Sequence, residues 1–237
     1  MKICLAYPQR LGDIIRILPI ARHFAADGNK VLVECLPPYH EFFDCVSYCR
    51  PSLRAERDAH RFDVVLDLEI WPNRFNEFVA SGKTWLDFVY GSSPMLAGID
   101  RKPVFDLIDE MPGLADYGLP ADASVFSPFG YSQRDRYTPK SLAEEAKKRI
   151  CGTFVTLADP IHADALSRAG IARNSILTAH RSSHLPRLLR DAKNVFTINS
   201  APSIICGAVR SEFWHVLGGD PQNDAISPAS RIVTFGA

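Results

Sequence analysis

The chain has 237 residues, 46% of them hydrophobic and 23% charged, and its 27 basic and 27 acidic side chains give a formal net charge of zero. That balance argues against a nucleic acid or an anionic membrane as a whole-protein electrostatic partner. Residues 1–120 carry 13 Lys and Arg against 17 Asp and Glu, a net of −4, and residues 121–237 carry 14 against 10, a net of +4. The basic C-terminal half therefore suits an anionic ligand such as a nucleotide diphosphate.

The six cysteines form no Cys-x-x-Cys pair, and most lie inside apolar runs, which is typical of buried free thiols rather than of a disulfide or metal framework. The apolar stretch before Pro8 is too short for the hydrophobic region of a signal peptide. No window approaches ~20 continuous apolar residues, the length that a membrane-spanning helix needs. We therefore expect a cytoplasmic monomer without an integral membrane segment.

Short β-like runs alternate with helical patterns along the first half of the chain, which is typical of parallel βαβ units. The patterns predict strands over 3–7, 31–35 and 62–68, and helices over 13–26, 40–48 and 74–80. The helix over 13–26 is the clearest, with apolar residues such as Ile14, Ile17 and Leu18 at helical spacing. Asp27-Gly28-Asn29 is typical of its C-terminal end.

Residues 111–123 are rich in Pro and Gly and form the predicted linker. The alternation then restarts, with strands predicted over 125–128, 153–157, 175–178, 195–198 and 213–217 and helices over 140–150, 162–169, 184–192 and 202–210. We therefore predict an α/β fold of two Rossmann-like domains facing across a cleft, an N-terminal domain over 1–115 and a C-terminal domain over 124–237. A single doubly wound sheet is the competing interpretation.

The loop that follows the first predicted strand is the first candidate site. Loops after the strands of an open α/β sheet line the crevice where ligands bind. Gly12 permits a close backbone approach there, and Asp13 falls in the first helical turn. A carboxylate in that place is a candidate general base toward a hydroxyl, although the helix dipole alone also favours it there. The same dipole is expected to lower the pKa of Asp13.

Three further loops of the second half are candidates for anion binding. In 197–203 a strand ends, Asn199 or Ser200 offers an N-cap, and the free N–H groups of the next helix suit a diphosphate. In 128–139, Arg134 and Arg136 are candidates to hold phosphate oxygens. The Gly-Gly-Asp-Pro loop at 218–221 also follows a predicted strand. A well-capped helix and solvated loops are the structural alternatives.

The remaining sequence patterns are weaker evidence for a functional site. Asp67-Leu68-Glu69 is a strand-end acidic pair of a kind that binds metals, but such pairs are common by chance. The histidines lack metal-ligand spacing such as His-Glu-x-x-His. The chain contains no G-x-S-x-G, Walker or G-x-G-x-x-G motif, which argues against a serine hydrolase, a P-loop protein and a dinucleotide oxidoreductase.

Taken together, the motifs resemble the ADP-heptose:lipopolysaccharide heptosyltransferase family, glycosyltransferase family nine. The first likeness is the order of a strand, Leu11-Gly12-Asp13 and a helix containing Pro19. Four more segments follow in the order of that family: 62–68 (FDVVLDL), 127–130 with 136–139, 199–202 with 206–208, and 217–221 (LGGDP).

The resemblance implies a GT-B fold and an inverting transfer without a metal or a cofactor, in which a nucleotide-diphospho sugar is the donor. Asp13 would be the general base that deprotonates the acceptor hydroxyl. The residues that would bind the donor are Gly12, Gly130, Arg134, Arg136, Asn199, Ser200, Ala201 and Asp220.

The chain departs from the family on the donor side. Asn199 stands where the family has an acidic residue, Ile204 where it has a histidine, Arg136 where it has a lysine and Ala201 where it has a glycine. The chain is also shorter than typical members. The donor nucleotide and sugar therefore stay open, whereas the base is kept.

Several functions remain as alternatives. The acceptor implied by the family is a lipopolysaccharide-core sugar or another glycan, and a hydroxymethylated base in phage DNA is a second possibility. DNA as a partner would depend on the basic groupings at 134–149 and 180–193, against the neutral net charge. A nucleotide-sugar-binding protein without catalysis and a nucleotide-sugar epimerase or hydrolase are rivals from other classes.

Overall fold

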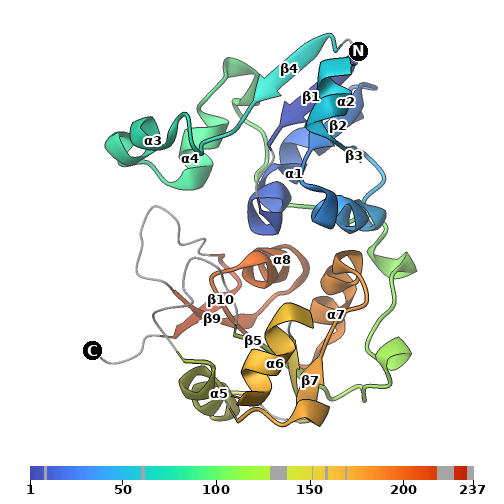
Figure 1. Ribbon diagram of the computed structural model, residues 1–237, viewed down its shortest axis with the longest axis vertical. Helices are drawn as coiled ribbons and strands as arrows, with labels where there is room; N and C mark the ends of the chain where they lie inside the picture. The colour runs from blue at the N-terminus through green and yellow to red at the C-terminus, as the bar shows by residue number, and fades with distance from the viewer. Residues whose placement is uncertain are drawn as a thin grey trace. The chain divides into compact units, whose positions relative to one another are not determined.

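The computed structural model describes residues 1–7, 10–59, 62–128, 138–150, 152–157, 160–168, 170–217 and 227–233. These residues divide into two compact units, unit 1 from Met1 to Leu107 and unit 2 from Ile108 onward. Each unit is built around its own parallel sheet with helices packed beside it (Figure 1). The predicted α/β fold of two Rossmann-like units is confirmed, and the alternative of a single doubly wound sheet is wrong. The division falls ahead of the stretch 111–123 that the sequence marks as the linker.

Unit 1 holds a four-stranded parallel sheet in the order β3-β2-β1-β4. Its strands are β1 (Lys2–Ala6), β2 (Lys30–Glu34), β3 (Arg50–Ser52) and β4 (Val64–Asp67). Its α-helices are α1 (Leu11–Ala26), α2 (Arg54–Ala59), α3 (Phe75–Ser81) and α4 (Trp85–Tyr90). Helix α1 forms where it is predicted because its apolar face, including Ile14, Leu18 and Ala21, is fully buried. The strand order reverses between β1 and β4.

Between β2 and β3 the chain forms a 3-10 helix, Pro37–Cys45, where the sequence predicts an α-helix over 40–48. That prediction is wrong in type and in extent. Val46 already has an extended backbone, with φ −135° and ψ 141°. The Tyr48 hydroxyl donates a hydrogen bond of 2.6 Å to the Val104 carbonyl oxygen. This long-range contact holds the chain where a continued helix would not place it.

Helix α4 is absent from the sequence prediction, which places a single helix in the region 71–100. The Thr84 hydroxyl accepts a hydrogen bond of 3.1 Å from the Asp87 amide and so caps the start of α4. A threonine followed three residues later by an acidic residue, just before an apolar run, was the signal available in the sequence. The short elements β3 and α2 were also missed.

Unit 2 holds a six-stranded parallel sheet in the order β10-β9-β8-β5-β6-β7. Its strands are β5 (Ser124–Ser127), β6 (Phe154–Leu157), β7 (Ile176–Leu177), β8 (Val195–Ile198), β9 (Phe213–Val216) and β10 (Ser230–Val233). Its α-helices are α5 (Pro139–Lys147), α6 (Pro160–Arg168), α7 (Leu185–Asp191) and α8 (Ala201–Val209). Short 3-10 helices in the chain lie at Pro94–Leu96, Ile108–Glu110, Ala115–Tyr117, Arg173–Ser175 and Ser182–His184. All the elements predicted for this half are present, β10 is an additional strand, and the strand order reverses between β5 and β8.

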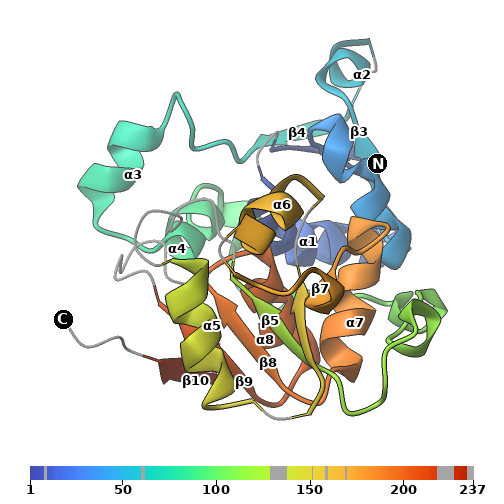
Figure 2. The same ribbon diagram turned by 60° about the horizontal axis from the view of Figure 1, so that its bottom comes forward.

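Both faces of the unit 2 sheet are covered by helices. On one face Phe126 and Phe196 pack in a cluster with Leu142 of α5, and Figure 2 shows α5 and α6 over this face. On the other face Val155 packs with Leu188 of α7. Burial on both sides explains why the strands read as continuous apolar runs in the sequence.

A row of buried polar side chains crosses this sheet. Ser127 of β5 pairs with Thr197 of β8, which pairs with His215 of β9. His215 is fully buried, and within the described residues neither of its ring nitrogens has a hydrogen-bond partner. Burial lowers the pKa of His215 to about 4, so that the imidazole is neutral in the folded protein.

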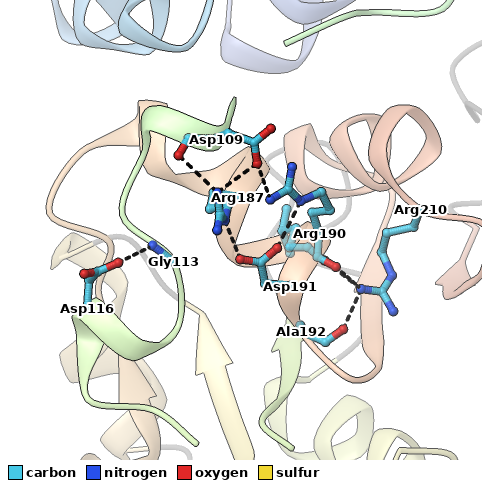
Figure 3. A network of polar contacts seen from close by, with 9 residues as sticks. Asp109, Gly113, Asp116, Arg187, Arg190, Asp191, Ala192 and Arg210 are labelled. Carbon is cyan, nitrogen blue, oxygen red and sulfur yellow. Dashed lines mark hydrogen bonds and ion pairs between the residues drawn. The ribbon is translucent and has the colours of Figure 1, made fainter. Parts of the chain in front are cut away.

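Ion pairs connect the first residues of unit 2 to helix α7 (Figure 3). The Asp109 carboxylate lies 3.0 Å from a guanidinium nitrogen of Arg187 and 2.9 Å from one of Arg190. Asp191 lies between the same two arginines, 2.5 Å from Arg187 and 3.0 Å from Arg190. Because Asp109 is 80% exposed, each of its pairs contributes little alone, and the network acts mainly by fixing the path of the chain.

Arg210 holds the carbonyl groups at the end of α7, which Figure 3 also shows. Its Nη1 donates to the carbonyl oxygens of Leu189 and Ala192, at 2.7 and 2.6 Å. Its Nη2 donates to the carbonyl oxygen of Lys193 at 3.2 Å. The last carbonyl groups of a helix have no partner within the helix, so a guanidinium in this place satisfies several of them at once.

Replacing Arg210 with methionine is therefore expected to lower the free energy of unfolding of unit 2 by roughly 2–3 kcal/mol, since several part-buried carbonyls lose a charged donor. Urea unfolding measures this loss. Arg173→Met is the matched control, because the ion pair of Arg173 with Asp164 is exposed on both sides and is expected to contribute less than about 1 kcal/mol. An equal loss in the two variants would contradict the role assigned to Arg210.

Five cysteines confirm the expectation of buried free thiols: Cys4, Cys35, Cys45, Cys49 and Cys206. Cys151 lies outside the described residues. Burial raises the pKa of Cys4 to about 11 and that of Cys206 to about 12, so both stay protonated and unreactive near neutral pH. Within the described ranges, no helix has the length and apolar character needed to cross a membrane.

Candidate functional site

The predicted catalytic turn lies where the strand order of the unit 1 sheet reverses. Strand β1 ends at Ala6, which pairs with Asp67 at the end of β4. The chain then turns into α1, which begins at Leu11, with residues 8–9 outside the described part. In open α/β sheets, ligands bind beyond the carboxyl ends of the strands at such a reversal. The topology therefore places Asp13, in the first turn of α1, at the expected binding crevice of unit 1.

Asp13 has a carboxylate that is neither exposed nor fully enclosed. The amides of Asp13 and Ile14 both donate hydrogen bonds of 3.0 Å to the Arg10 carbonyl oxygen, which begins α1 without a side-chain cap. The Asp13 side chain is 28% exposed. Within the described residues, no group donates a hydrogen bond to its carboxylate. Gly12 lies beside it in the same turn.

Arg16 lies next to this carboxylate and is itself packed against aromatic rings. Nη1 of Arg16 lies 3.9 Å from Oδ1 of Asp13, and the Arg16 side chain is only 9% exposed. The Arg16 guanidinium lies over the ring of Trp85, 5.2 Å from its centroid. Tyr7 meets the same ring edge-on, with centroids 5.6 Å apart. The cation beside the carboxylate is thus backed by the ring of Trp85, which in turn meets the ring of Tyr7.

The environment raises the pKa of Asp13, mainly because burial disfavours the ionised carboxylate, while Arg16 and Arg10 act in the opposite direction. The sequence-based expectation that the helix dipole would lower this pKa is therefore wrong. The physical reason is that loss of hydration outweighs both the dipole and the two arginines. A carboxylate with a raised pKa is the stronger base once it is ionised.

Asp67 and Glu69, at the end of β4, do not form a metal site in the structure. The Asp67 carboxylate accepts a hydrogen bond of 3.0 Å from the Glu69 amide, as in an ordinary Asx turn. No group of three or more metal-ligating side chains occurs among the described residues. A reaction without a metal remains a prediction.

In unit 2 the strand order reverses between β5 and β8, and the predicted donor residues 199–201 directly follow β8. Ser127, the last residue of β5, pairs with Thr197, close to the end of β8. The loop leaving β5 carries three of the predicted donor residues, and a further one lies in the loop after β9. Gly130, Arg134, Arg136 and Asp220 all lie outside the described residues.

The consecutive residues Asn199, Ser200 and Ala201 lie between the end of β8 and the start of α8. Asn199 is buried, and its backbone N–H donates a hydrogen bond of 3.2 Å to the Val216 carbonyl oxygen. The Ser200 amide donates to Oγ of Ser203 at 3.0 Å, which is one half of a capping box. Oγ of Ser200 donates to the Ile198 carbonyl oxygen at 2.9 Å. The start of α8 is thus a rigid turn at the strand end.

Sequence reasoning missed Arg16, Trp85 and Tyr7. A signal was available for Arg16, since it follows Asp13 by three residues inside an otherwise apolar helix and must share a face with it. Trp85 and Tyr7 had no such signal, because they approach Asp13 only through tertiary packing.

No protein-family model matches the chain, and no curated protein matches its sequence. Solved structures do match its fold. A family 9 glycosyl transferase from Veillonella parvula has a TM-score of 0.67 at 10% identity, covering 98% of this chain and 85% of that one. The ADP-heptose lps heptosyltransferase II of E. coli has a TM-score of 0.64 at 14% identity, covering 98% and 90%.

The E. coli heptosyltransferase WaaC, solved with ADP, has a TM-score of 0.59 at 14% identity, covering 98% of this chain and 92% of that one. All three matches extend over both units. The chain therefore has the fold of the family nine glycosyltransferases and heptosyltransferases, the GT-B fold, from one end of its sequence to the other.

Proposed function

We propose that this chain is a glycosyltransferase that moves a sugar from a nucleotide-diphospho sugar to an acceptor hydroxyl with inversion, using Asp13 as the general base. The observation that carries the proposal is the Asp13 carboxylate itself. It lies in the first turn of α1 at the reversal point of the unit 1 sheet, with its side chain 28% exposed and a cation beside it. The fold supports the proposal, because transferases of nucleotide sugars share it.

The chemistry follows from the position of the base. The acceptor oxygen forms a bond to the anomeric carbon while the bond from that carbon to the diphosphate oxygen breaks. The acceptor proton passes to Asp13, and the electron pair of the broken bond leaves on the nucleoside diphosphate. Because burial raises the pKa of Asp13, the ionised carboxylate is a better proton acceptor than one in water. No cofactor other than the donor takes part in the proposal.

The donor is proposed to bind in unit 2. The start of α8 offers the positive end of its helix dipole to a diphosphate, while the N–H groups of Asn199, Ser200 and Ser203 are already hydrogen-bonded within the chain. Asn199 is neutral where the resembled family is acidic, and we propose that it contacts the donor without repelling its charge. Gly130, Arg134, Arg136 and Asp220 are proposed to complete the donor site together with Ser200 and Ala201. The leaving diphosphate would be stabilised there as its charge develops.

Nucleotide-sugar binding is the direct test of this proposal. The purified chain is heated in the presence of ADP-, UDP-, GDP- and CDP-sugars and of the matching nucleoside diphosphates. One nucleotide class is expected to raise the melting temperature by several degrees at saturating concentration, because a ligand that binds only the folded state stabilises it. Calorimetric titration then gives its affinity. If none of the nucleotides shifts the melting temperature or binds in the calorimeter, the transferase proposal fails.

The acceptor is proposed to be a glycan hydroxyl, as the resemblance to the heptosyltransferase family implies. Donor turnover with a panel of oligosaccharides tests this part, with plain and hydroxymethylated DNA as comparison acceptors. Turnover that needs a glycan supports the proposal. Turnover only with hydroxymethylated DNA, weakening steeply as salt is raised, would replace the glycan by the nucleic-acid acceptor.

A further inference from the structure

Arg16 is held in place from two sides by helix α4. Its guanidinium lies over the Trp85 ring, 5.2 Å from the centroid, a distance at which a cation is attracted to the face of the ring. Its backbone carbonyl oxygen accepts a hydrogen bond of 3.0 Å from the Tyr90 hydroxyl. Both aromatic residues are buried. An arginine with its backbone and its head group fixed by one helix has little freedom to turn away.

Trp85 is itself fixed. It is the first residue of α4, directly after the Thr84 N-cap, and it is 6% exposed. Tyr7, which follows β1, meets its ring at an interplanar angle of 84°. The ring is therefore clamped between the end of the central strand and the start of α4. Its position defines where the Arg16 charge lies.

We propose that Arg16 is a positioning residue of this site: held by Trp85 and Tyr90, it places a fixed positive charge beside the Asp13 carboxylate and favours its ionised form. The proposal rests on the proposed function for its catalytic meaning. The separation of 3.9 Å between Nη1 and Oδ1 provides charge stabilisation without occupying the oxygen lone pairs in a short hydrogen bond. Burial makes Asp13 a stronger base, and the Arg16 charge counteracts it enough to favour the ionised form that can accept a proton.

The charged groups near Asp13 decide how its protonation responds to Arg16. Arg10, at the start of α1, and Arg16 both favour the ionised carboxylate. Tyr7 faces it as a buried phenol whose pKa is raised, first by burial and then by the Asp13 charge, so it stays neutral. Glu69 adds negative charge on the side of Tyr7. Arg10 is exposed and screened by water, so Arg16 is expected to have the greater effect.

The test is a direct titration of the Asp13 carboxyl by carbon-detected NMR in four forms of the full chain: wild type, Arg16→Met, Arg16→Lys and Arg22→Met. Arg16→Met keeps most of the buried volume and removes the charge. Loss of the Arg16 charge is expected to move the midpoint of the Asp13 titration up by about one pH unit, because an opposite charge within a few ångströms favours the ionised form. Arg16→Lys is expected to return most of that shift. Arg22→Met, an exposed arginine farther along α1, is the matched control and is expected to leave the titration unchanged.

A second variant covers the case in which Arg16→Met does not fold. Trp85→Phe keeps an aromatic ring but weakens the platform, and it is expected to raise the Asp13 titration by a smaller amount. Once the donor and acceptor are identified, the pH dependence of kcat/KM can be measured for each variant. Its acid limb is expected to move by the same number of pH units as the NMR titration of Asp13.

The two proposals fail in different ways. An Asp13 titration that does not move in Arg16→Met, or that moves equally in Arg22→Met, overturns the role of Arg16 whatever the activity. A shifted titration in a protein that binds no nucleotide sugar upholds the coupling of Arg16 to Asp13 and overturns the transferase. A shifted titration with an unmoved acid limb would show that Arg16 does not act on catalysis.

Discussion

Replacing Asp13 with asparagine is expected to lower sugar transfer by a factor of about 10³ while the affinity for the nucleotide sugar stays within about twofold. General base catalysis typically contributes ~10² to 10⁴ in rate, and asparagine keeps the size of the side chain without its basicity. Donor binding is expected to change little because, apart from Gly12, the residues proposed for it lie in unit 2, and Asp13→Asn leaves Gly12 in place. Steady-state turnover together with calorimetric titration of the donor measures both quantities.

The matched control is Asp27→Asn, at the other end of the same helix. Asp27 follows the last residue of α1 and is exposed, so its charge has no part in the site. Its replacement is expected to leave turnover within twofold of the wild type. Stability should change little in either variant, by less than about 1 kcal/mol, since one loses a favourable and the other an unfavourable contact with the helix dipole. A loss of turnover in Asp13→Asn that merely follows a loss of folding would contradict the assignment.

The second large effect is an acid-induced loss of stability through His215. Its pKa is 6.5 in the unfolded chain and about 4 when buried in the folded one. The contribution of the buried neutral His215 to the stability of the folded state is fully present above pH 6.5. As the pH falls from there toward 4, the unfolded chain takes up a proton that the folded chain refuses, so stability is lost. A difference of this size corresponds to roughly 3 kcal/mol of unfolding free energy.

His215→Phe separates this effect from general acid denaturation. The variant replaces an imidazole without hydrogen-bond partners among the described residues by an apolar ring of similar size. Its free energy of unfolding at pH 7 is expected to equal or exceed that of the wild type. Its loss between pH 7 and pH 4 should be smaller by roughly 2–3 kcal/mol. Urea unfolding at the two pH values, followed by hydrogen exchange of the β8 and β9 amides, measures the difference.

The control for His215 is His23→Gln, on the exposed surface of α1. It removes a histidine without touching the unit 2 sheet and is expected to keep the full pH dependence of the wild type. If His215→Phe and the wild type lose the same stability between pH 7 and pH 4, His215 is protonated in the folded state and the assignment is wrong.

The sequence predicts the α/β architecture well because the long-range order of the sheets follows from local patterns. The apolar periodicity of α1 and the buried runs of β8 and β9 each fix an element and its face. Short elements such as β3 and α2 escape prediction, since a strand of three residues exists only through its pairing partner. The 3-10 helix at Pro37–Cys45 escapes as well, because tertiary contacts after it decide where it ends.

The candidate site divides in the same way. Asp13 could be found from the sequence because a loop, a glycine and an acidic residue at a helix start occur together there. The direction of its pKa shift could not, because the shift depends mainly on burial in the folded protein, which the local sequence does not give. On the donor side, the sequence predicts the strand over 195–198 that the structure shows as β8, and this strand places the consecutive residues Asn199, Ser200 and Ala201 at the start of α8. The donor-binding roles of the loop residues, among them Arg136, remain predictions.

The measurement that tests the account most directly is the proton NMR spectrum of the transferred sugar, recorded with the donor and acceptor that binding and turnover select. The account predicts a new glycosidic bond whose anomeric configuration is opposite to that of the donor. It also predicts that Asp13→Asn, with the donor bound at wild-type affinity, forms this product about 10³ times more slowly. A product of retained configuration, or one formed at the wild-type rate by Asp13→Asn, would contradict it.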